Sequence, residues 1–161
     1  HIDLPAELPM IQYRGFSTSG LKNINIPDTT DIYDEAFRYC FNLTEITFPK
    51  YLISIAPGVC YNCENLETVH TYENLLYIGG QAFAYCKNLK DIYLPSKTPV
   101  KLLGSDDVFE GLGYITHRIK IHVPNDFELM AQYYFNTDNG WVNYLWSDLN
   151  PNGILELVND L

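Results

Sequence analysis

Apolar residues recur along this chain with a period of 23 positions. Each of three Asn-Leu pairs is followed, three residues after the leucine, by isoleucine or valine: Leu43 and Ile46, Leu66 and Val69, Leu89 and Ile92. We call residues at equivalent positions of successive repeats a column. Two further columns, upstream of the leucine, keep the same spacing: Ile32, Ile55 and Ile78, then Cys40, Cys63 and Cys86. A fixed period in the twenties indicates a repeat protein in which stacked coils share one core.

Within each copy, the segment after the leucine predicts a strand. Ile46 and Phe48 alternate with polar residues, which is typical of a strand with one buried face, and Pro49 then ends it. A copy is too short for a strand, a full helix and a return. The mixed spacing over residues 78–86 therefore predicts irregular or one-turn helical structure on the opposite side. We expect about six such coils over residues 1–124, the first one truncated, with the leucine and isoleucine columns buried in one parallel sheet.

After Pro124 the period stops and helix signals begin. Asn125 and Glu128 have the spacing of a capping box. An amphipathic stripe follows at Phe127, Met130, Ala131 and Tyr134, then a shorter one at Trp141, Tyr144 and Leu145, and last an apolar segment from Ile154 to Val158. Because a solenoid end exposes its core, we expect residues 125–161 to form a helical cap on the last coil. The alternative is a small ligand-binding appendage built on Trp141 and Trp146.

One copy carries nearly all the columns of a known repeat: Ile78-Gly79, Ala82-Phe83, Cys86, Leu89, Ile92 and Leu94-Pro95. This pattern resembles the BspA-like leucine-rich repeat family, and the resemblance extends over residues 1–124. Departures occur at Ala56-Pro57, Cys60, Tyr72 and the stretched coil over 96–117. The resemblance implies an α/β solenoid with a parallel concave sheet and short irregular or helical convex turns. It also implies an extracellular or cell-surface location, often bacterial, and binding rather than catalysis.

Charge and hydropathy narrow the classes of partner. A formal net charge of −10 argues against nucleic acid, which is bound chiefly through Lys and Arg. The sequence has no apolar run of about 18 residues, so we expect no membrane span in it. The first residues already occupy a strand column, and we therefore expect this chain to be a portion of a longer protein. We also expect a monomer without a cofactor.

The four cysteines allow several interpretations. Cys60 and Cys63 have the spacing of half a zinc site or of a redox dithiol. However, Cys63 shares its column with Cys40 and Cys86, and Cys60 fills a column that is otherwise phenylalanine, so packing explains both. Disulfides between neighbouring coils are within reach, but three cysteines in one column cannot all pair. We expect free, buried thiols and no bound metal.

Catalytic signals are sparse. The four histidines, His1, His70, His117 and His122, form no metal-binding or nucleophile motif, and a thiolate is disfavoured in a core column. We therefore expect no enzymatic activity. Asn42-Leu43-Thr44 fits the glycosylation acceptor pattern, but Asn42 belongs to the repeated Asn-Leu column, which accounts for it without glycosylation.

The strand period predicts a surface. Residues that flank the inward Ile or Val column point outward, because strand side chains alternate. The candidate ligand-binding residues on this concave face are Glu45, His70, Asp91, Tyr93, Lys120 and His122. We expect a cell-surface or secreted module that recognises a protein or a glycan there. The alternative is a structural spacer or assembly scaffold whose sheet face is only solvated.

Overall fold

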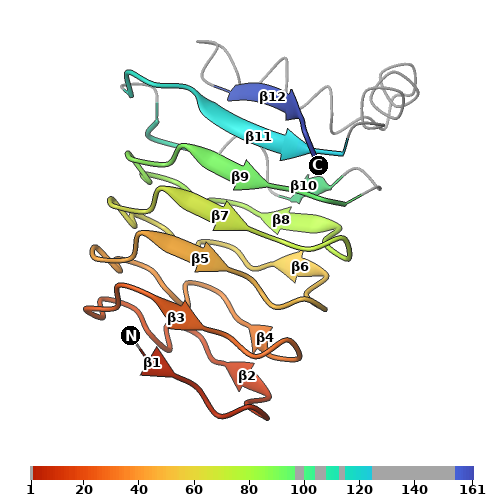
Figure 1. Cartoon of the computed structure of the whole chain (residues 1–161). Helices are drawn as coiled ribbons and strands as arrows, with labels where there is room; N and C mark the ends of the chain where they lie inside the picture. Colours follow the sequence, from red (N-terminus) through yellow and green to blue (C-terminus); the bar gives the residue numbers. More distant parts are fainter. Residues whose placement is uncertain (1, 97–99, 104–107, 113–114, 125–154) are drawn as a thin grey trace.

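The strands lie one above another in two layers, and the chain climbs from coil to coil (Figure 1). The computed structural model describes residues 2–96, 100–103, 108–112, 115–124 and 155–161. The front layer contains β1 (Ile2–Asp3), β3 (Ile24–Asn25), β5 (Glu45–Thr47), β7 (Thr68–His70), β9 (Asp91–Tyr93), β11 (Ile119–Val123) and β12 (Leu155–Asn159). The back layer contains β2 (Met10–Ile11), β4 (Asp31–Ile32), β6 (Ser54–Ile55), β8 (Tyr77–Gly79) and β10 (Lys101–Leu103). We call these layers the front sheet and the back sheet.

The register of the front sheet reproduces the period of the sequence. Ile46 lies opposite Val69, Val69 opposite Ile92, and Ile92 opposite Ile121, always between parallel strands. The predicted parallel sheet is therefore confirmed. Each repeat contributes one rung, so residues of one column become neighbours in space.

The core runs between the two sheets. The predicted leucine and isoleucine columns are all buried: Leu43, Ile46, Leu66, Val69, Leu89 and Ile92. Phe37 and Phe83 fill the space toward the back turns with no exposed surface. Burial of these side chains stabilises the stack, at roughly 25 cal/mol for each Å² of apolar surface removed from water.

The back of each coil differs from the prediction. Short strands centred on Ile11, Ile32, Ile55 and Ile78 pair in parallel, and left-handed turns follow them. Two left-handed positions recur: Glu35, Gly58 and Gln81 in one column, and Tyr39, Asn62 and Tyr85 in the other. A right-handed helix cannot pass through such residues. The described residues contain no helix, so of the two alternatives predicted for the convex turns, irregular or helical, the helical one is not supported, and this part of the chain is all β.

The predicted helical cap falls mainly outside the described residues, which omit 125–154. Its last apolar segment was predicted from Ile154 to Val158, and residues 155–158 of it lie in strand β12. This strand pairs in parallel with β11 and extends the front sheet by one rung. The end of the chain is tied down as well, since the backbone amides of Asp160 and Leu161 donate to the carbonyl of Val123.

Strand pairing lapses once in the described part of the chain, between the second and third coils. The front sheet divides into β1-β3 and β5 to β12, and the back sheet divides into β2-β4 and β6-β8-β10. The back turns stay joined there, because the amides of Glu35, Phe37 and Tyr39 donate to the next coil at 3.0, 2.8 and 2.9 Å. The coils therefore remain one stack but separate along their strands.

Candidate functional site

Three rings form a stacked ladder on the outer face of the front sheet. The ring centroids of His70 and Tyr93 are 4.6 Å apart with planes 9° from parallel, and those of Tyr93 and His122 are 4.2 Å apart at 11°. In-register parallel strands lie about 4.8 Å apart, close to the spacing of stacked rings. One aromatic or imidazole side chain on each of β7, β9 and β11 therefore stacks on the next. We call this the ring ladder.

Carboxylates flank the imidazoles of the ladder. Glu45 Oε1 lies 3.3 Å from His70 Nε2. His122 is held on both sides, with Nε2 2.9 Å from Asp91 Oδ1 and Nδ1 2.9 Å from Asp160 Oδ2. A neutral imidazole has one N–H and can donate to only one of these carboxylates, whereas the imidazolium donates to both. His122 thus connects the β9 strand to the end of the chain.

The six predicted site residues do not share one environment. His122 is buried, with 7% of its surface exposed, and both of its ring nitrogens are occupied. Its ring stacks on that of Tyr93 and forms one end of the ladder. The other five predicted residues reach solvent: Glu45, His70, Asp91, Tyr93 and Lys120. Lys120 is exposed and has no ion-pair partner among the described residues.

Asp160 is the one participant that sequence reasoning missed. It lies 38 positions from His122 along the chain, beyond the last repeat, and no column relates the two. The stacking itself had a visible signal. His70, Tyr93 and His122 occupy the same column on three successive rungs, so Tyr93 lies directly between the two histidines.

The cysteine column has a structural function. Each thiol donates to a backbone carbonyl of the preceding coil: Cys40 to Phe16, Cys63 to Phe37 and Cys86 to Cys60, at 3.0, 3.0 and 3.1 Å. All four cysteines are free and buried, as predicted. Burial raises the pKa of the Cys60 and Cys86 thiols well above the ordinary value, so they stay protonated at neutral pH.

Metal sites and membrane-spanning helices are absent from the described residues. These residues contain no group of three or more His, Cys, Asp or Glu side chains placed to hold a metal ion. In the same part of the chain, no helix has the length and apolar character needed to cross a membrane. The ring ladder with its charged neighbours is therefore the candidate site on the front sheet.

Comparison with known proteins agrees with the architecture. Residues 1–116 match the BspA type leucine rich repeat region, in six copies. A comparison with curated proteins finds no match. The matched region covers more than half of the 161 residues and includes every coil from β1 to β10. The chain belongs to the BspA-type leucine-rich repeat family.

Proposed function

We propose that this chain is a cell-surface or secreted module that binds a protein ligand through the outer face of its front sheet. Membership of a leucine-rich repeat family supports a binding role. The observation that carries the choice of surface is the ring ladder, bordered by Glu45 and Lys120. Rigid aromatic area beside charges of both signs is typical of protein recognition sites.

The geometry favours a protein over a glycan. A sugar ring binds aromatic residues by lying flat on an open face, but His70 and His122 cover both faces of Tyr93. His70 and Tyr93, which are partly exposed, therefore meet solvent at their ring edges and polar tips. Such edges suit hydrogen bonds and side-chain packing from a protein surface. The proposal includes no catalytic step, since the buried thiols are protonated and make poor nucleophiles.

The test compares wild type with Tyr93→Ala and Lys120→Glu on an array of extracellular proteins and on a glycan array. We expect wild type to bind one or more protein spots and each variant to lose them while still melting cooperatively, with a somewhat lower Tm for Tyr93→Ala because it loses two ring contacts. Phe41→Ala is a matched control, because this ring is 46% exposed and lies outside the front sheet. Equal binding by all variants would support the spacer or scaffold alternative. Binding to the glycan array alone would overturn the choice of ligand.

A further inference from the structure

The connection between β3 and β4 is one residue shorter than its neighbours. Seven residues separate Ile24 from Ile32, whereas eight separate the matching pairs, Ile2 and Ile11, Ile46 and Ile55, and Val69 and Ile78. All of these residues except Ile2 are buried in the same core, so they must occupy equivalent positions. The shorter segment therefore takes a tighter path around the edge of the stack.

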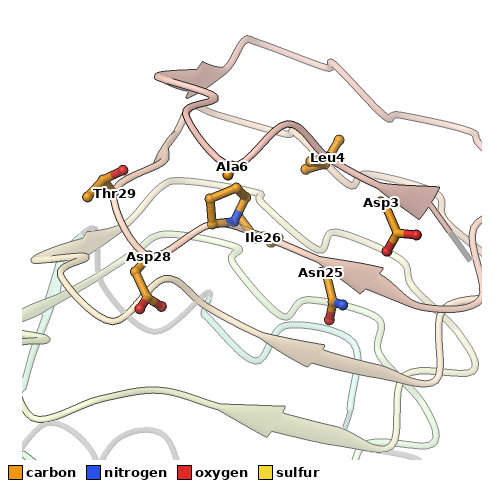
Figure 2. A pocket seen from close by; sticks show the side chains of 8 residues that line it. Asp3, Leu4, Ala6, Asn25, Ile26, Asp28 and Thr29 are labelled. Atoms are coloured by element: carbon orange, nitrogen blue, oxygen red, sulfur yellow. The ribbon is translucent and has the colours of Figure 1, made fainter.

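Hollows lie on both sides of this tight connection. Figure 2 shows the first, an open hollow of about 510 Å³ between Leu4 and Ala6 of the first coil and Ile26 and Asp28 of the second. On the other side, toward the third coil, two adjoining hollows of about 320 and 270 Å³ share Asp31, Tyr51 and Leu52 in their walls. They coincide with the place where β4 and β6 fail to pair.

The two adjoining hollows form a groove that we call the β4–β6 groove. Its walls include Asp28, Asp31, Tyr33, Asp34, Tyr51 and Ile53. Tyr33, Tyr51 and Ile53 are 49%, 57% and 56% exposed, although large apolar side chains gain by burial. In addition, β4 and β6 each have one edge without a strand partner. These edges face each other across the groove, and the amides of Tyr51 and Glu35 donate to the carbonyls of Asp28 and Pro57 on either side of it.

The charge around the β4–β6 groove decides what it accepts. Asp28, Asp31 and Asp34 are exposed, and none of them pairs with a described cation. The neighbouring cation is Lys50, whose ammonium lies 5.8 Å from the centre of the Tyr51 ring. This contact shows that Tyr51 presents a ring face to positive charge. The net charge of −10 adds a long-range attraction for basic partners.

We propose that the β4–β6 groove binds an extended, arginine-bearing segment of a partner protein. A guanidinium stacks on an aromatic face and donates two parallel hydrogen bonds to a carboxylate. Both kinds of group line the groove, namely Tyr33 and Tyr51 together with Asp31 and Asp34. This surface is separate from the ring ladder, and the inference does not depend on the proposed function of the front sheet.

The probe is a short fluorescent peptide that alternates arginine with threonine, and its binding to the full chain is followed by fluorescence anisotropy. We expect saturable binding by wild type. Replacing both Asp31→Asn and Asp34→Asn should weaken binding about tenfold, because two exposed charge pairs are lost. Tyr51→Ala should weaken it about fivefold through the lost ring contact. All three positions are exposed, so the variants should melt at the temperature of wild type.

Matched controls separate the groove from general charge attraction. Glu64→Gln with Glu67→Gln changes the net charge by the same amount outside the groove, at carboxylates that pair with Lys87 and Lys90. This variant should keep wild-type affinity, and so should Tyr93→Ala on the ring ladder. The same peptide with citrulline in place of arginine should bind at least tenfold more weakly. The proposal is overturned if the glutamate control loses as much affinity as the aspartate variant, or if the citrulline peptide binds equally well. It is also overturned if the wild-type chain sediments as a dimer that Tyr51→Ala dissociates.

Discussion

Gly79 gives a sharp test of how closely the coils are stacked. A Cβ atom built on Gly79 would lie 2.6 Å from the backbone nitrogen of Pro57, 2.8 Å from its Cδ and 2.9 Å from its Cα. Real Cβ atoms do not approach other atoms within 3.0 Å, and the proline ring and backbone cannot swing away as a flexible side chain does. Gly79→Ala therefore forces the third and fourth coils apart by several tenths of an ångström.

The expected cost is about 2–3 kcal/mol of unfolding free energy, the upper part of the range for overpacked sites. For a chain of this size, that loss lowers Tm by roughly 5–10 °C. Urea titration followed by far-UV circular dichroism measures it directly.

Gly20→Ala is the matched control, since the nearest heavy atom to its added Cβ is the Asn42 side-chain nitrogen at 3.9 Å. This substitution should change stability by less than about 0.5 kcal/mol or increase it slightly, because alanine restricts the unfolded chain. Pro57→Ala removes only the Cδ contact and should rescue Gly79→Ala in part. Equal stability of the two glycine variants, or full rescue by Pro57→Ala, would refute the reasoning.

Three further predictions concern the core, the thiols and an ion pair. Ile92→Ala should cost about 2–5 kcal/mol in urea titration and Ile92→Val about 1 kcal/mol, since this side chain is 1% exposed; similar costs for both would contradict the packing. Iodoacetamide at pH 8 should leave Cys60 and Cys86 unmodified in native protein and alkylate them in denaturant, because burial raises the pKa of both thiols; rapid native labelling in a mass spectrum would show an open core. Partial burial pushes the pKa of Glu35 upward, but hydrogen bonds from Arg14 and Arg38 outweigh it and hold the pKa below its ordinary value of 4.5. The contribution of Glu35 to folding stability is therefore complete above about pH 4.5 and is lost as the pH falls through the lower, folded-state pKa. Glu35→Gln should consequently flatten the acid side of a curve of unfolding free energy against pH. An unchanged acid side would count against the ion pairs of Glu35 with Arg14 and Arg38.

The repeat columns made much of the front sheet predictable. Because the period is fixed at 23 residues, the repeated apolar positions that begin with Leu43 and Ile46 had to face one core. The same period predicts the strand register, in which Ile46 lies opposite Val69. The outward positions Tyr93 and Lys120 followed from strand alternation.

The back sheet was harder to predict because its sequences show no alternation of apolar and polar residues. The Ile32, Ile55 and Ile78 column was its one visible sign. The left-handed turns were hidden as well, since side-chain-bearing residues such as Glu35 and Tyr39 occupy them instead of glycine. Asp160, which pairs with His122, lies in a segment outside the repeats, so the repeat columns could not predict this contact.

The lapse in strand pairing between the second and third coils has a mechanical consequence. In a repeat protein, stability is approximately a sum of the coils and of the interfaces between neighbours. The interface at the lapse retains core packing and turn hydrogen bonds but lacks both strand ladders, so it is the weakest coupling in the described part of the stack. Denaturation should consequently proceed in two cooperative blocks. Amides of the first two coils would then exchange with solvent at a lower opening energy than those of β7 and β9. A pulling force along the stack would break it first at this seam.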